Sequence, residues 1–215
     1  MQLIEIFNKI FDSENFNNAK NAPYSKQNPF YKLFDNDIPR AMRMIVNELQ
    51  RPLTINYECK GSIGAGVLAD TFWFNIMNPN VTRDPQKGVY IVYLVASSGK
   101  YIHLCLIQST GIIDNPAKLD GLKPELLKKS KKIQKALVES TEIQPLDGLG
   151  LFNHGAVSLG SSPSLTSQAY EAAVILSKTY EKAVDILDEN ELRGDLKNML
   201  DIYKRYYSLM QHGKI

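Results

Sequence analysis

Two long apolar runs, separated by a short polar connection, constrain the fold of this chain most. They span residues 88–96 and 100–108, and Ser97-Ser98-Gly99 joins them. Each run has the length and the β-branched and aromatic content of a strand, and the short glycine-containing link is typical of a hairpin. Neither run alternates apolar with polar residues, so both faces of each strand should be buried. The sequence therefore predicts a hairpin at the centre of a sheet, with another layer on each side.

Two shorter strands are predicted ahead of this hairpin. Residues 53–59 alternate in polarity, and residues 72–77 place Phe72 and Phe74 on one side and Trp73 on the other. The cluster Gly61-Ser62-Ile63-Gly64-Ala65-Gly66 lies between them. Three glycines in six residues permit positive φ angles and a close approach of the backbone to another group. We expect a glycine loop that connects two strands.

Helical periodicity and end signals predict helices on both sides of the strands. The region between the first two helices, 13–36, is rich in asparagine and is interpreted as a long loop. Asp37 and Ser164 are the expected N-caps of the second helix and the fourth helix. The predicted helices span residues 2–12, 39–50, 123–139, 164–187 and 189–210.

Together these elements indicate an α+β fold. We expect a curved, mixed or antiparallel central β-sheet, flanked by helices, with a helical pair at the C-terminus. A chain of 215 residues can build one sizeable core. Residues 1–36 are interpreted as an N-terminal helix and loop, and residues 37–215 as the main domain, within a single domain overall.

Charge and composition exclude several classes of protein. The formal net charge is only +2, so a nucleic-acid surface would have to be local. The lysine-rich stretch 123–135 is the candidate, although such a stretch is also typical of a solvated helix face. No apolar run reaches 18 residues and the N-terminus lacks a basic secretion signal, which favours a cytoplasmic protein without a membrane segment. Cys59 and Cys105 form no CxxC motif and are expected to be reduced thiols.

No catalytic motif is apparent. The glycine spacing GxxGxG lacks the G-K-[ST] ending of a phosphate loop and differs from the GxGxxG dinucleotide fingerprint. His103 has no partner at ligand spacing, and no nucleophile triad, carboxylate pair or nuclease motif stands out. We therefore expect a binding domain without catalytic residues, metal or cofactor.

A family resemblance rests on the central stretch. Lys60-Gly61-Ser62, a further glycine pair and Trp73 are followed by G-V-Y-I-V-Y-L from Gly88 and by Y-I-H-L-C-L-I-Q-S from Tyr101. This pattern resembles the N-terminal DNA-binding domain of McrB-type modification-dependent restriction proteins. Patterns at 170–180 and 192–203 are similar to the end of that domain, so the resemblance covers roughly residues 40–210.

The resemblance implies recognition of a modified base, above all methylated cytosine, that is flipped out of double-stranded DNA. Trp73, Tyr90 and Leu94 match the positions that line the base pocket, and a later loop, where Phe152 or His154 is a candidate, adds another aromatic group. It also implies two partners, a GTP-dependent AAA+ motor domain and a nuclease subunit, which would supply movement and cleavage.

DNA contacts are expected from the glycine loop and from basic side chains. Ala65 stands where some members of the family carry an aromatic residue, and Ile63 and Val67 are the nearest apolar wedges. The expected loop contacts are Ser62, Ile63, Gly64, Ala65 and Gly66. The expected phosphate contacts are Lys60, Lys128, Lys129 and Lys132.

Other interpretations remain open from the residues. Trp73, Tyr90 and Leu94 could be ordinary core. The chain could read an unmodified DNA sequence, or it could be a small α+β domain that binds a free nucleobase-like molecule. A protein-interaction surface on the stripe Tyr203, Tyr206 and Tyr207 is a further alternative.

Overall fold

The fold is α+β and is built on an antiparallel sheet. The computed structural model describes residues 1–52, 55–140, 157–182 and 187–215. Within these residues, five strands form one open sheet in the order β1-β2-β3-β4-β5, each pairing antiparallel with the next. The predicted fold class is confirmed. The strands are β1 (Glu58–Gly64), β2 (Leu68–Met77), β3 (Val89–Val95), β4 (Tyr101–Gln108) and β5 (Val174–Glu181).

The central hairpin forms as predicted. β3 and β4 pair along their whole length, from Val89 opposite Gln108 to Val95 opposite Ile102. Every residue of β3 is buried. An uninterrupted apolar run therefore indicates a strand that is covered on both faces.

The glycine cluster is mostly strand rather than loop. β1 begins at Glu58 and runs through Gly61 to Gly64, so the strand expected at 53–59 starts later than predicted. Gly61 lies under the backbone of Phe34, where an added Cβ would come within 2.2 Å of a carbonyl oxygen. The close approach predicted from the glycines thus occurs within the protein, between β1 and the segment before α3.

Residues 13–36 are more helical than predicted. α1 (Leu3–Phe11) is followed at once by α2 (Ser13–Asn21), because the Asp12 carboxylate accepts hydrogen bonds from the backbone N–H groups of Glu14 and Asn15. A wider helical turn, η1 (Leu33–Asp37), runs directly into α3 (Ile38–Leu49). Asp37 is therefore inside continuous helical structure and does not cap α3 with its side chain, contrary to expectation.

The predicted helix over 164–187 is wrong beyond its first turns. Ser164 caps α5 (Leu165–Ala173) as expected, by accepting a hydrogen bond from Ser167 N. The chain then becomes β5, which pairs with the outer edge of β4. Pairing with an unfilled strand edge outweighs the helical spacing of these residues. The expected C-terminal helical pair is thus a short helix, an edge strand and one long helix, α6 (Glu189–Gln211).

α4 also begins earlier than predicted. It spans Pro116–Glu139, with Asn115 as its N-cap, so Pro124 lies inside the helix instead of near its start. Within the described residues, no helix is long and apolar enough to cross a membrane.

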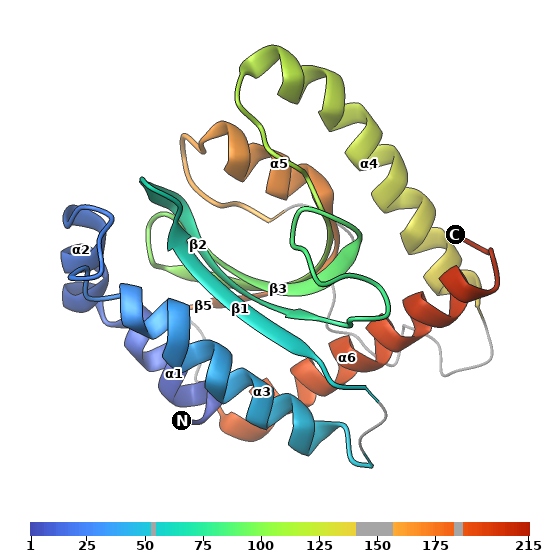
Figure 1. Cartoon of the computed structure of the whole chain (residues 1–215), viewed down its shortest axis with the longest axis horizontal. Coiled ribbons are helices and arrows are strands. Elements are labelled where there is room, and N and C mark those ends of the chain that lie inside the picture. Colours follow the sequence, from blue (N-terminus) through green and yellow to red (C-terminus); the bar gives the residue numbers. More distant parts are fainter. Residues whose placement is uncertain (53–54, 141–156, 183–186) are drawn as a thin grey trace.

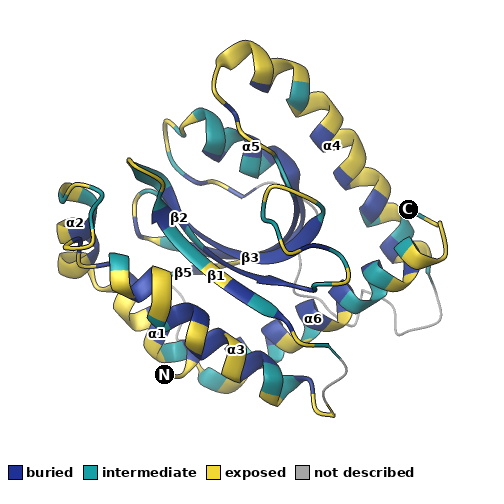
Figure 2. Ribbon diagram, in the orientation of Figure 1, coloured by how far each residue is buried: buried dark blue, intermediate teal, exposed yellow. Residues whose placement is uncertain are grey.

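The two faces of the sheet are covered differently. The sheet curves, with α1, α3 and α6 along its outer face and α5 over its inner face, while α4 runs beside α5 (Figure 1). The Phe7 ring of α1 packs edge-on against Tyr93 and Tyr180, and the Phe74 ring stacks on Tyr93. β3 and β4 are almost wholly buried, β1 at the edge is mostly half-buried, and α4 exposes most of its length (Figure 2).

The tyrosine stripe of α6 belongs to the core. Tyr203 and Tyr206 are buried, and the Tyr203 hydroxyl donates to the carbonyl oxygen of Val89 at 2.7 Å. Tyr207 is half-buried. A partner could not reach the two buried rings without unfolding the helix, so Tyr203 and Tyr206 do not form an interaction surface.

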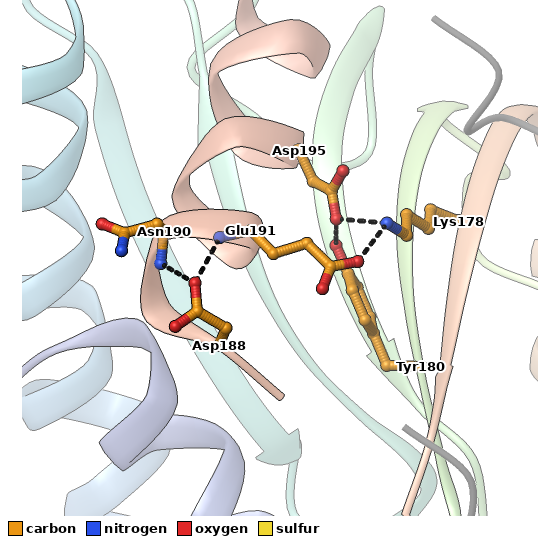
Figure 3. A network of polar contacts seen from close by, with 6 residues as sticks. All are labelled: Lys178, Tyr180, Asp188, Asn190, Glu191 and Asp195. Atoms are coloured by element: carbon orange, nitrogen blue, oxygen red, sulfur yellow. Dashed lines mark hydrogen bonds and ion pairs between the residues drawn. The ribbon is translucent and has the colours of Figure 1, made fainter. Parts of the chain in front are cut away.

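A buried ionic network ties α6 to the edge strand (Figure 3). The Asp195 carboxylate, which is 2% exposed, lies 2.7 Å from Lys178 Nζ and accepts a hydrogen bond from the Tyr180 hydroxyl at 2.8 Å. Burial lowers the pKa of Lys178, but hydrogen bonds and charge attraction from Asp195 and Glu191 outweigh it, so the net pKa is raised. The lysine therefore stays charged and depends on its partners.

Asp195→Ala should destabilise the protein by about 3–5 kcal/mol, because it leaves Lys178 with its charge half-buried and its main partner gone. Glu191→Ala removes a carboxylate that is 60% exposed and should cost no more than about 1 kcal/mol. Urea unfolding followed by circular dichroism would measure both. Equal losses for the two variants would contradict a special role for the buried carboxylate.

Candidate functional site

A cavity of about 620 Å³ opens on the inner face of the sheet. This size is within the range of small-molecule and cofactor pockets. The β1–β2 hairpin, the N-terminal half of α5 and the segments around 85–86 and 110–113 surround it. Side chains of β2, β3 and β4 form its floor, namely Thr71, Trp73, Tyr90, Val92, Leu94 and Ile107.

The sheet register brings the three predicted pocket residues together. Trp73 of β2 pairs directly with Leu94 of β3, and Tyr90 lies four residues earlier on the same face. Trp73 is half-buried, whereas Tyr90 and Leu94 are 6% and 1% exposed. All three nevertheless line the cavity. The arrangement provides an aromatic wall and an apolar floor, as a flat ligand requires.

Tyrosine hydroxyls supply donors within this apolar surface. Burial raises the pKa of Tyr90, and the neighbouring Tyr170 and Asp84 raise it further. Burial also raises the pKa of Tyr170, which lines the α5 side of the cavity. Both phenols therefore remain protonated at neutral pH and can donate hydrogen bonds.

A polar network fastens α5 to β2 along one wall. The Asp70 carboxylate accepts from Ser164 N and from the Ser167 hydroxyl, both at 3.1 Å. The Ser167 hydroxyl also lies 2.9 Å from that of Thr71. These groups all line the cavity. The network fixes the helix over the sheet and places a carboxylate at the cavity wall.

Lys20 of α2 supports the same strand from outside the cavity. Its Nζ donates to the carbonyl oxygens of Ala69 and Asp70, at 3.1 and 2.8 Å, and lies 4.7 Å from the centre of the Phe72 ring. Burial lowers the pKa of Lys20, while the charge of Asp70 opposes that shift. The start of β2 is thus held between α2 and α5.

The tip of the β1–β2 hairpin forms another wall. Ser62, Gly64 and Ala65 line the cavity, and Gly66 is exposed. Gly64 has a φ of 144°, and an added Cβ would lie 2.0 Å from the Val67 carbonyl oxygen, so only glycine fits. Ile63 is 2% exposed and packs in the core, so it is not available as the apolar wedge that the sequence suggested. Val67, the alternative, is exposed.

The predicted phosphate contacts lie outside the cavity. Lys128, Lys129 and Lys132 are exposed on α4, while Lys60 on β1 donates to the Arg83 carbonyl oxygen at 2.9 Å. In the part of the chain that the structure describes, Asp70 is the one charged residue that lines the cavity. Phe152 and His154, proposed for an additional aromatic group, lie outside the described residues. Within those residues, no group of three or more His, Cys, Asp or Glu side chains could hold a metal ion.

Comparison with known protein families matches residues 13–208 to the MrcB-like N-terminal domain. The chain belongs to the MrcB-like N-terminal domain family. The match covers most of the chain and confirms the resemblance drawn from the central strands. No curated protein matches the sequence. Membership supports a DNA-binding module of a restriction system, which agrees with a binding domain rather than an enzyme.

Several residues of this MrcB-like domain that shape the cavity were not identified from the sequence as site residues. Asp70, Ser167 and Tyr170 come to the cavity only because α5 folds back over β2. The sequence predicted that Ser164 caps a helix. It could not predict where that helix packs, because the position depends on contacts with Asp70, almost a hundred residues away. Ile112 lies in a connection without a recognisable motif.

His103 lies on the same face of the sheet, opposite Leu94, but does not line the cavity. Its Nδ1 is 2.8 Å from the Thr179 hydroxyl, and its Nε2 is 3.1 Å from the Ser158 carbonyl oxygen. Burial lowers the pKa of His103 to about 4, although the Ser158 carbonyl partly opposes this. The imidazole is therefore neutral and structural at physiological pH.

Stability should fall as the pH drops from 6.5 towards 4. The unfolded chain binds a proton on this histidine in that range and the folded domain does not, so protonation favours unfolding by up to about 3 kcal/mol. His103→Gln should remove much of this dependence of stability on pH. His212→Gln, at the exposed end of α6, should leave the dependence in place. Thermal unfolding between pH 7 and pH 4 would compare them. A slope unchanged in His103→Gln would contradict the assignment.

Proposed function

We propose that this domain recognises double-stranded DNA containing a modified base, foremost methylated cytosine, by turning that base into the cavity. The observation that carries the proposal is the convergence of Trp73, Tyr90 and Leu94 on one cavity in a domain of a DNA-binding family. These are the positions that the family resemblance assigned to a base pocket. The open space beside these three side chains supports a pocket over ordinary core packing.

The chemistry of the cavity suits a neutral flat ring. Stacking of a base on an aromatic side chain is worth about 1–3 kcal/mol, and extrusion from the duplex costs a few kcal/mol. Two walls with hydrogen bonds could therefore offset the extrusion. Tyr90 and Tyr170 offer donors, and the Asp70 carboxylate can accept from an exocyclic amino group such as that of cytosine.

The charge distribution keeps phosphate groups outside. A carboxylate and no cation lines the cavity within the described residues, so an anion would be repelled from it. The exposed lysines of α4 offer the opposite charge on a separate surface. We infer that the base enters the cavity while the sugar-phosphate backbone runs outside, contacting Lys128, Lys129 and Lys132, with Lys60 near the β1–β2 hairpin.

In this proposal the domain only selects the DNA. A GTP-dependent AAA+ motor domain and a nuclease subunit, in other domains or subunits, would move along the DNA and cut it, and the whole system would act in the cytoplasm. DNA movement and cleavage would then take place only where the domain has bound a modified base.

Trp73→Ala and Tyr90→Ala should each weaken binding to a methylcytosine duplex by about 10- to 100-fold, because each removes a wall of the base pocket. Lys129→Ala should weaken binding only a few-fold and equally for all duplexes. Fluorescence anisotropy with duplexes carrying cytosine, 5-methylcytosine, N4-methylcytosine or N6-methyladenine would measure this.

Equal, weak binding to all four duplexes would refute modified-base recognition. If the reverse ranking held, with Lys129→Ala more damaging than Trp73→Ala, the domain would bind the backbone alone. Thermal-shift assays with free nucleobases and nucleosides would distinguish the alternative of a small-molecule pocket, since a true ligand stabilises by mass action.

Simultaneous replacement of Lys128, Lys129 and Lys132 by alanine should reduce the salt dependence of DNA binding. Each lost phosphate contact lowers the slope of log K against log salt by about 0.9, so the slope should fall by about 2–3. Alanine at Lys9, Lys197 and Lys204, on α1 and α6, changes the net charge equally on the other side of the sheet. An equal fall in both triple variants would mean that only overall charge matters.

A further inference from the structure

Two large apolar side chains are strongly exposed, and both lie at the cavity. Val67 is 74% exposed and Ile112 is 63% exposed, the highest values for large hydrophobic residues in the described part of the chain. Both line the cavity. Apolar side chains exposed beside a binding site commonly mark a contact with a partner.

The two side chains come from separate segments. Val67 lies at the β1–β2 turn, directly after Gly66, and Ile112 lies in the β4–α4 connection, directly after Gly111. Each glycine has a positive φ, 75° and 67°, and nothing lies within 4 Å of the position where its Cβ would be. Both turns therefore have open space beside their glycines.

The β4–α4 connection also leads into the basic helix. Within a few turns of Ile112, α4 presents the exposed lysines Lys118, Lys123, Lys128 and Lys129. Exposed acidic residues Asp114, Asp120 and Glu125 lie among the first two, and Lys118 pairs with Asp114 at 3.5 Å, so the cationic part of the helix begins at Lys128. An apolar tip followed by a cationic helix complements a nucleic acid, whose bases are apolar in the stack and whose backbone is anionic. The same combination does not suit an apolar protein partner.

We propose that the β4–α4 connection is a second DNA-inserting segment, and that Ile112 acts with Val67 as a pair of wedges in the base stack around the extruded nucleotide. This inference rests on the proposed function, and its occupant is duplex DNA. A flipped base leaves its neighbours without a stacking partner, and apolar side chains inserted between base steps are a known means of stabilising such a distortion. The β1–β2 turn and the β4–α4 connection would thus each insert one apolar side chain into the duplex and together keep it open.

The experiment uses a duplex with 2-aminopurine next to 5-methylcytosine, whose fluorescence rises when its stacking is lost. The wild-type domain should raise the signal and bind tightly. Val67→Ser and Ile112→Ser should each weaken binding about tenfold and reduce the rise in fluorescence. The double variant should bind more weakly, and raise the fluorescence less, than either single variant. Met44→Ser, at a side chain 58% exposed on α3, is the matched control and should change neither.

A second duplex, with the methylcytosine mispaired, separates insertion from simple contact. Extrusion of a mispaired base costs less, so the penalty of the serine variants should shrink on this duplex. If Ile112→Ser binds and raises fluorescence like the wild type, Ile112 is not a wedge, while modified-base recognition stands.

If the wild type prefers the methylated duplex but leaves 2-aminopurine stacked, insertion is also refuted. A wild type that ignores methylation and leaves the fluorescence unchanged would overturn both the insertion and the proposed function. Stronger binding of free nucleobases that depends equally on Val67 and Ile112 would show that these residues instead close over a small ligand.

Discussion

The antiparallel register between β2 and β3 is the constraint on which the site depends. It places Trp73 opposite Leu94 on the inner face and Phe74 opposite Tyr93 on the outer face. Because side chains alternate along a strand, a slip of one residue would exchange these sets and remove the indole from the cavity. The stacked rings of Phe74 and Tyr93, 4.6 Å apart, oppose such a slip from the other side of the sheet. Core packing on one face thus sets the geometry of the site on the other.

The cavity exists because the two faces of the sheet are covered unequally. Three helices cover the outer face (Figure 1). Aromatic and aliphatic side chains of these helices pack in the core. On the inner face α5 is short, because the chain leaves it after Ala173 to become β5. Asp70, Ser164 and Ser167 then hold the start of this helix at a fixed place over β2. The surface that a longer helix would have covered is left open.

The local sequence pattern was sufficient to predict which strand residues of the site share a face. Alternation over 72–77 and the four-residue spacing of Tyr90 and Leu94 predict a common face, and the register between neighbouring strands then brings them together. Ile63 shows the limit of the same reasoning. Glycines on both sides suggested an exposed loop, but β1 continues through them and turns the side chain into the core. A glycine cluster indicates a special backbone without saying which side chains it exposes.

The incorrect prediction of a helix at residues 174–181 has a long-range cause. Leu176 and Tyr180 are four residues apart, a spacing that fits both the helical and the strand period, so periodicity alone could not decide between a helix and a strand. The free edge of β4 favours the strand. Pairing with β5 satisfies the backbone N–H and C=O groups along that edge, which a helix at residues 174–181 would leave unpaired. Once β5 is in place, the half-buried charge of Lys178 needs a buried partner, and Asp195 of α6 supplies it.

Separation of charge follows from this arrangement and could not be read from composition. A net charge of +2 conceals a helix with exposed lysines and a cavity whose one charged lining residue, within the described chain, is acidic. A carboxylate at the cavity wall disfavours a phosphate inside, while the lysines favour one outside. This separation of charge suits the proposed binding mode, in which a neutral base enters the cavity past Asp70 while the anionic backbone stays on the side of the α4 lysines.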